Sequence, residues 1–197
     1  GYICAEPRRE FFAKMDAANV DLKAFTDDFY VRLCGAHLQP VLDTLVYLKR
    51  ETQVWLEITT LLIPGENDRP EEIQAMCEWI RRELGPDTPL HFTAFHPAWK
   101  LLDRPPTPAR TLVAARQIAL QAGLQYVYLG NIHSTEGATT HCPACGATLI
   151  RREGYDIVEY RLTDNGHCPD CDTSIAGRFG SFKGSFGSQR IPVHMGQ

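Results

Sequence analysis

The sequence predicts an α/β fold in two parts: a partial TIM-type (β/α) barrel over residues 1–133 and a small cysteine-based module over residues 141–179. Three observations predict it. Strand-like and helix-like segments alternate up to about residue 132, the pattern of βα units around a parallel sheet. Only four strand candidates appear there, whereas a closed (β/α)₈ barrel has eight strands in about 250 residues. Two Cys-x-x-Cys pairs follow, at 142–145 and 168–171.

The four strand candidates are rich in β-branched and apolar residues and end at turn signals. They cover residues 20–25, 54–63, 90–96 and 126–129. Between them, apolar residues recur at helical spacing and predict helices near residues 38–46, 71–80 and 107–119. The first residues, 1–3, look as if the chain entered in the middle of a strand. We therefore expect the chain to be the C-terminal portion of a longer barrel.

The ends of the helices carry their own signals. Asp68 with Glu71 predicts a capping box for the second helix. Thr107 followed by Pro108 predicts the start of the third helix, and Gly123 predicts its end.

Composition narrows the functional classes. The hydrophobic content of 44% is enough for a real core, and the net charge of -4 argues against a nucleic-acid binder. No apolar run is long enough for a membrane span and no signal peptide is recognisable, so a cytoplasmic location is expected. A Ser/Thr/Gly-rich linker is predicted at 134–140 and a loosely ordered tail at 180–197.

Cys142, Cys145, Cys168 and Cys171 form the strongest motif. Two Cys-x-x-Cys turns at this separation present four thiolates tetrahedrally, which suits Zn²⁺ and predicts a zinc ribbon. The alternative is two strained disulfides. One departure is visible: Gly146 follows the first pair, but Asp172 stands where the second pair would usually have glycine. The other cysteines share no motif and are expected to be buried or incidental.

Polar residues recur at corresponding places on three successive strands. Asp21 and Lys23 share one parity, opposite Val20 and Leu22, so they face inward or lie at the strand end. They form either a self-satisfied ion pair or part of a site that a charged ligand completes. Glu57 and Thr59 show the same parity on the next strand, and His96 follows the third.

These segments resemble a known family. Residues 20–23, the Cys34-Gly35 step, residues 54–57 and 63–68, and Phe95-His96 are similar to the second half of radical S-adenosylmethionine (SAM) enzymes of the pyruvate formate-lyase activating type. Residues 55–68, 91–97 and 126–131, the double Cys-Pro-x-Cys ribbon and residues 175–179 resemble more closely the AmmeMemoRadiSam system radical SAM enzymes.

The resemblance implies roles for several residues. Lys23 would meet the carboxylate of S-adenosylmethionine, Asp21 would hold a monovalent cation beside it, and His96 would reach the cofactor. Glu57 stands where the activating enzymes carry arginine, which leaves it as a contact to the cofactor's ammonium group, the substrate or a neighbouring strand. Thr59 belongs to the same candidate site. Memo-like and AMMECR-like proteins are the implied partners.

The family's Cys-x-x-x-Cys-x-x-Cys loop, which holds the 4Fe-4S cluster, is absent from this sequence. We therefore expect the cluster ligands outside this chain and no radical chemistry from the chain alone. In the complete enzyme, reductive cleavage of S-adenosylmethionine would yield a 5'-deoxyadenosyl radical that abstracts hydrogen from an unknown substrate.

Two alternatives come from other classes. The ribbon could be an adaptor for a protein or nucleic acid, although three arginines against six acidic residues over 137–172 disfavour nucleic acid. The other alternative is a barrel aldolase in which Lys23 forms a Schiff base with its substrate. Asp21 beside Lys23 disfavours it, because such a lysine lies in a dehydrated pocket.

Overall fold

The computed structural model describes residues 1–179, so the tail predicted at 180–197 lies outside the described residues. The chain divides into two compact units, Gly1–Ile132 and His133–Gln197. We call them the α/β unit and the cysteine unit. No helix in the described part of the chain combines the length and apolar character that a bilayer crossing requires.

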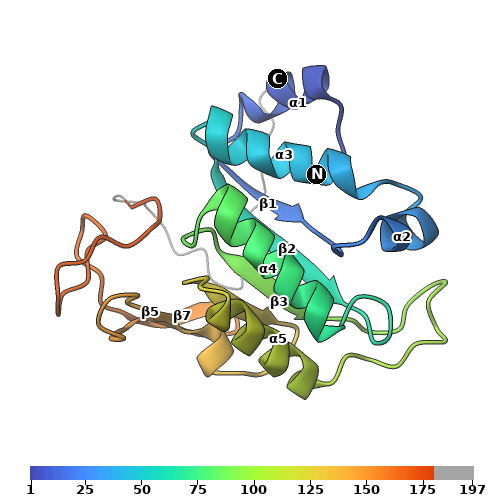
Figure 1. Cartoon of the computed structure of the whole chain (residues 1–197). Helices are drawn as coiled ribbons and strands as arrows, with labels where there is room; N and C mark the ends of the chain where they lie inside the picture. The colour runs from blue at the N-terminus through green and yellow to red at the C-terminus, as the bar shows by residue number, and fades with distance from the viewer. Residues whose placement is uncertain (180–197) are drawn as a thin grey trace, which may run out of the picture. The chain divides into compact units, whose positions relative to one another are not determined.

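A parallel sheet of four strands forms the centre of the α/β unit, in the order β1 (Ala17–Asp21), β2 (Trp55–Leu62), β3 (Leu90–Ala94) and β4 (Val127–Gly130). The connections contain α3 (Leu38–Glu51), α4 (Pro70–Leu84) and α5 (Ala109–Gln121), and Figure 1 shows these three helices side by side across one face of the sheet. The described residues thus contain four βα-type strands in sequence order and no closed barrel.

Alternation along the strands separates the two faces of the sheet. On β2, Leu56, Ile58, Thr60 and Leu62 are buried on the side of the helices, while Glu57, Thr59 and Leu61 between them are only half-buried. Leu45 and Leu48 of α3 and the apolar faces of α4 and α5 complete one continuous core on that side. The opposite face carries the polar residues of the strands, and it is this face that the sequence parity of Glu57 and Thr59 predicted.

The first strand differs from its prediction. It spans Ala17–Asp21 instead of 20–25, so Lys23 lies two residues beyond it. The backbone leaves the sheet because new partners take its polar groups: the Lys23 N–H donates to Tyr30 Oη (3.0 Å), and its C=O accepts from Asn67 Nδ2 (2.6 Å). Burial raises the pKa of Tyr30 to about 12, which keeps that hydroxyl protonated.

Three short helices were not predicted: α1 (Ala5–Phe12), α2 (Asp27–Phe29) and the π-helix η1 (Tyr30–Cys34). Residues 1–4 precede α1 and lie outside the sheet, contrary to the expected strand at the start.

Both predicted helix caps were wrong. The helix α4 begins at Pro70 after Arg69, because the Asp68 carboxylate accepts from Gly65 N–H instead (2.9 Å). The helix α5 begins at Ala109, because the Thr107 hydroxyl is used between strand ends. The predicted stop at Gly123 is confirmed, since Gly123 has a φ of 95°, a conformation that favours glycine.

The cysteine unit contains a three-stranded antiparallel sheet, β5 (Thr140–His141), β6 (Thr148–Glu153) and β7 (Asp156–Tyr160), after a short 3-10 turn, η2 (Glu136–Ala138). The alternating sequence of residues 155–162 predicts a hairpin strand, and β7 lies within that range. Burial does not alternate along β7, because Ile157, Val158 and Tyr160 are all exposed.

Candidate cofactor and metal sites

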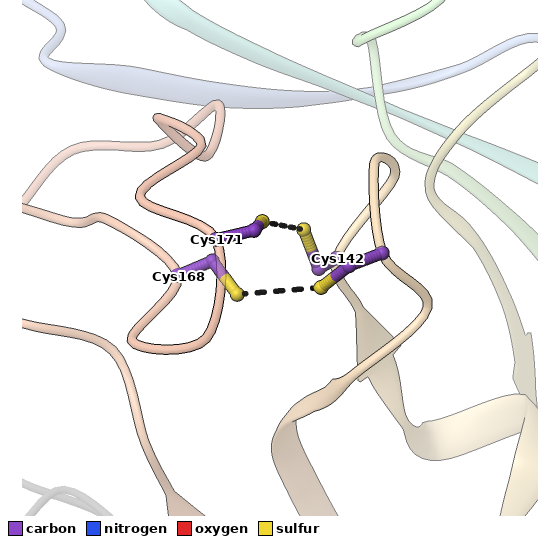
Figure 2. Close-up of side chains that lie close together, drawn as sticks. Cys142, Cys168 and Cys171 are labelled. Carbon is purple, nitrogen blue, oxygen red and sulfur yellow. Dashed lines mark hydrogen bonds between the residues drawn. The ribbon is translucent and has the colours of Figure 1, made fainter.

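The four cysteines of the cysteine unit converge. Their sulfur atoms all lie within 4.8 Å of one another. Figure 2 shows the side chains of Cys142, Cys168 and Cys171 pointing toward one another from two separate turns. The Sγ atoms of Cys142 and Cys171 are 3.6 Å apart, and those of Cys145 and Cys168 are 3.7 Å apart. All are free thiols, so the disulfide alternative is wrong in this structure.

These distances fit a single tetrahedral ion. A Zn–S bond of about 2.3 Å implies sulfur atoms about 3.8 Å apart at the corners of a tetrahedron. Two of the sulfur atoms belong to buried cysteines, Cys142 and Cys168, and two to exposed ones. The group can therefore hold one metal ion at the edge of the cysteine unit.

The two cysteine turns have the same backbone design. Gly146 N–H donates to Cys142 C=O, and Asp172 N–H donates to Cys168 C=O, each at 2.9 Å. Gly146 and Asp172 both adopt the left-handed conformation, with φ of 75° and 58°. Aspartate tolerates this conformation better than most residues, and its carboxylate contacts His167 Nδ1 at 3.0 Å. The unusual Asp172 is thus accommodated without loss of the turn.

The Cys171 thiol has a hydrogen-bonding partner in its neighbour Thr173. Hydrogen bonds from the hydroxyl and the backbone N–H of Thr173 lower the pKa of the Cys171 thiol to about 6. The Thr173 Oγ1 atom lies 3.2 Å from the sulfur. Because the thiolate is the metal ligand, this hydrogen bonding favours the form that binds.

In the α/β unit, buried polar side chains join the carboxyl ends of the strands. Asn67, 2% exposed, donates to the C=O groups of Lys23 and Leu61 and accepts from Ile63 N–H. Thr107 donates to Leu62 C=O at 2.6 Å and accepts from Phe95 N–H at 2.9 Å. Ligands of parallel α/β folds bind at this edge of the sheet, and these bonds hold it in one geometry.

Asp21 and Lys23 lie together at this edge. Lys23 Nζ is 2.9 Å from Asp21 Oδ2, and both side chains are partly exposed, 39% and 53% respectively. The opposite parity of Val20 and Leu22, at 4% and 0% exposed, is confirmed. An ammonium group has three donors, so a second acceptor can bind Lys23 without breaking the pair.

The remaining predicted residues, Thr59, Glu57 and His96, lie at three separate places. Thr59 is the register partner of Asp21 and donates to Asn19 Oδ1 (2.8 Å). Glu57, two residues earlier on β2, contacts the neighbouring strand through His91 of β3 at 2.9 Å. His96 is exposed, two residues beyond the end of β3.

A charged bridge connects three loops at the carboxyl edge. The Glu66 carboxylate, on a side chain only 6% exposed, accepts from Arg104 at 2.7 Å and from Arg32 at 3.0 Å. Hydrogen bonds from Arg104 and then Arg32 lower the pKa of Glu66 below its usual 4.5. Arg32, Glu66 and Arg104 follow β1, β2 and β3 respectively, so one buried carboxylate ties the three loops together.

Sequence reasoning missed Asn67, Glu66 and His91. Asn67 and Glu66 lie in a turn whose sequence contains no periodicity, and their partners are distant in the chain. His91 had a signal that was not used: within the third strand it has the parity of Thr93, whose register partner is Leu61 on the same face as Glu57.

No family model matches the chain. Over 176 residues the chain is 46% identical to the uncharacterized protein MJ0808 of Methanocaldococcus jannaschii. The match covers 89% of this chain and 52% of that protein, so the chain spans about half the length of its curated relative.

Two solved structures share the fold. A domain of pyruvate-formate lyase-activating enzyme from Bacteroides vulgatus superimposes with a TM-score of 0.56 and 17% identity, over 65% of this chain and 75% of that one. A radical SAM methyltransferase from Sphaerobacter thermophilus superimposes with a TM-score of 0.53 and 16% identity, over 72% of this chain and 41% of that one. The fold of this chain is thus similar to those of an activating-enzyme domain and a radical SAM methyltransferase. At these identities the likeness shows the fold alone.

Proposed function

We propose that this chain is the C-terminal part of a radical SAM enzyme, which in its complete form abstracts a hydrogen atom from its substrate with S-adenosylmethionine and a 4Fe-4S cluster. The observation that carries the proposal is the Lys23–Asp21 pair at the carboxyl end of β1, in a sheet with the radical SAM fold. The cofactors supply the radical chemistry when bound. We assign the cluster ligands to the part of the protein outside this chain.

The chain's own residues would bind and orient the cofactor. The Lys23 ammonium is a point charge suited to a carboxylate, and its pairing with Asp21 limits its movement. His96, exposed after β3, would approach from the next loop but one. Thr59 and Glu57 extend the site along β2. Asn67 donates to the Lys23 C=O and so fixes the backbone from which the Lys23 side chain projects.

Finer assignments extend the same proposal. The sequence motifs support membership of the AmmeMemoRadiSam system, with Memo-like and AMMECR-like proteins as partners and a cytoplasmic location. We assign Zn²⁺ to the four cysteines. All four sulfur atoms lie within 4.8 Å of one another, which supports a single ion, because a cluster of several irons would hold some of its ligands farther apart.

The test is S-adenosylmethionine binding by the longer protein with its cluster loaded. Lys23→Ala removes the charge opposite the cofactor carboxylate. Loss of a charge-assisted hydrogen bond costs about 1.5–3 kcal/mol, which corresponds to about 10- to 150-fold weaker affinity. Lys23→Arg should restore affinity only in part, since the guanidinium needs a different approach.

Lys49→Ala is the matched control, since Lys49 forms another Lys–Asp pair, with Asp87 at 3.2 Å, before the amino end of β3 and away from the carboxyl ends of the strands. It should leave the affinity unchanged. Wild-type affinity in Lys23→Ala with an intact cluster would refute the assignment of Lys23 and return it to a structural ion pair.

A second candidate function, protein binding by the cysteine unit, has an observation of its own. Tyr155, Ile157, Val158 and Tyr160 are 81%, 58%, 44% and 54% exposed on or beside the edge strand β7. Large exposed apolar groups beside an unpaired strand edge are typical of partner-binding surfaces. Ile157→Asp should abolish co-purification of a partner while preserving metal content; retained binding would exclude this surface.

A further inference from the structure

The chain leaves β1 at Asp21 and continues through an irregular segment, residues 22–25. Leu22 and Ala24 in this segment are buried. A buried backbone outside regular structure must find other partners for its N–H and C=O groups. Side chains from four different parts of the α/β unit supply these partners, and Lys23 lies in the middle of the segment.

The Lys23 backbone is held on both sides of its Cα atom. Its N–H donates to Tyr30 Oη at 3.0 Å, and its C=O accepts from Asn67 Nδ2 at 2.6 Å. Tyr30 belongs to η1 and Asn67 to the turn after β2, and both residues are buried. Because both partners are enclosed by protein, water cannot replace either bond unless the fold opens.

The residues on either side of Lys23 are held in the same way. The hydroxyl of Thr60, a buried residue of β2, donates to Leu22 C=O at 2.8 Å. The carboxylate of Glu72, near the start of α4, accepts from Phe25 N–H at 2.9 Å. Four side chains thus fix the segment, and we call them the backbone clamp: Tyr30, Thr60, Asn67 and Glu72.

The clamp leaves only the side chain of Lys23 free to change conformation. Leu22 and Ala24 belong to the apolar core, whereas the Lys23 side chain between them is partly exposed, with its ammonium 2.9 Å from Asp21 Oδ2. A ligand of this ammonium therefore meets a residue whose backbone is already ordered. Less conformational entropy is lost on binding when the site is ordered in advance.

We propose that the backbone clamp consists of positioning residues: by ordering residues 22–25 before the ligand arrives, it raises the affinity of the Lys23 ammonium for the cofactor carboxylate. The inference rests on the proposed function, since it takes the carboxylate of S-adenosylmethionine as the ligand. The clamp acts through the Lys23 backbone and not by contact with the cofactor. Its effect on affinity should therefore vanish when the Lys23 side chain is absent.

The test is a double-mutant cycle for S-adenosylmethionine binding by the longer protein with its cluster loaded. Tyr30→Phe removes only the hydroxyl that accepts from Lys23 N–H. It should weaken the affinity by about 2- to 10-fold, the effect of one neutral hydrogen bond. In a Lys23→Ala background the same substitution should cause no further loss, because the side chain that the clamp positions is gone.

Two further variants separate positioning from stability. Thr60→Val removes the bond to Leu22 C=O and should behave like Tyr30→Phe. Thr44→Val is the matched control, since the Thr44 hydroxyl is also buried and donates to Pro40 C=O at 2.9 Å within α3. It removes a buried hydrogen bond of the α/β unit and should leave the affinity unchanged in both backgrounds.

A second measurement needs neither cofactor nor cluster. The Lys23 ammonium signal is followed by NMR in the 197-residue chain and assigned with Lys23→Ala. Pairing with Asp21 slows the exchange of the ammonium hydrogens with water, so Tyr30→Phe should speed it up by loosening the backbone that holds the pair. The ammonium of Lys49, paired with Asp87 at 3.2 Å, is the internal control and should not change.

Three results would overturn the proposal: an affinity unchanged by Tyr30→Phe, an equal loss of affinity in both backgrounds, or an exchange rate of the Lys23 ammonium that Tyr30→Phe does not alter. Each of them leaves the assignment of Lys23 standing. Wild-type affinity in Lys23→Ala alone would refute the proposed function and this inference with it. Failure of the clamp is therefore distinguishable from failure of the proposed function.

Discussion

The two units of this chain are stabilised in different ways. The α/β unit buries a continuous apolar core between one sheet face and its helices, with Leu45, Leu48 and Ile58 fully enclosed. The described residues of the cysteine unit bury only three aliphatic side chains, Leu149, Leu162 and Ile175, besides Cys142 and Cys168. So small a core cannot support a fold alone. The α/β unit is therefore stabilised by burial, whereas the cysteine unit needs a further contribution, which a metal ion bound by its four cysteines would supply.

Removal of a metal ion from the four cysteines should give the largest difference in stability between the two units. Structural zinc contributes about 10–16 kcal/mol of apparent binding free energy to a small domain. With a chelator, or in Cys142→Ser, residues 140–175 should become protease-sensitive while the α/β unit keeps its melting temperature. Cys34→Ser, at an exposed thiol outside the metal group, is the control. Equal proteolysis with and without chelator would remove the distinction between the units.

The reverse experiment truncates the core. Ile58 is 0% exposed in the middle of β2, so Ile58→Ala should lower the free energy of unfolding of the α/β unit by about 2–5 kcal/mol. Metal content should stay at the wild-type level. Val113→Ala, on the exposed side of α5, should change stability by less than about 0.5 kcal/mol. Loss of metal in Ile58→Ala would show that the units depend on each other.

Asn67 tests whether polar bonds also matter within the α/β unit. Asn67→Ala leaves the partly buried C=O groups of Lys23 and Leu61 without this donor, which should cost about 1–3 kcal/mol. Denaturant unfolding measures the loss, and Gln39→Ala, an exposed amide on α3, is the control. If both variants unfold alike, the strand ends are held by packing alone.

The smallest effect concerns pH. Arg104 and Arg32 lower the pKa of Glu66 in the folded state below its usual 4.5. The Glu66 contribution to stability is therefore complete above about pH 4.5 and is lost as the pH falls through the lowered value. Melting temperatures of the α/β unit across this range should fall less steeply in Glu66→Gln than in wild type. Parallel curves would show that the bridge contributes nothing.

Particular residues show how far sequence reasoning reached. Periodicity predicted the βα order, the buried face of β2 and the shared parity of Asp21 and Lys23, because each depends on neighbours a few positions apart. The caps at Asp68 and Thr107 failed for a specific reason. Their side chains satisfy backbone groups outside the helices that they were expected to begin, and Thr107 reaches Leu62, which is 45 residues away.

The sequence by itself determined the four-cysteine group, the parallel sheet and the polar face of β2, because motif spacing and side-chain alternation are local properties of the chain. Only the tertiary structure decided that Glu57 meets His91, that Glu66 ties three loops, and that Lys23 stands beyond the strand with Asn67 on its carbonyl. Strand register and loop conformation bring these partners together from 34 to 44 residues apart. Such contacts leave no pattern along the sequence, since each partner alone is an ordinary polar residue.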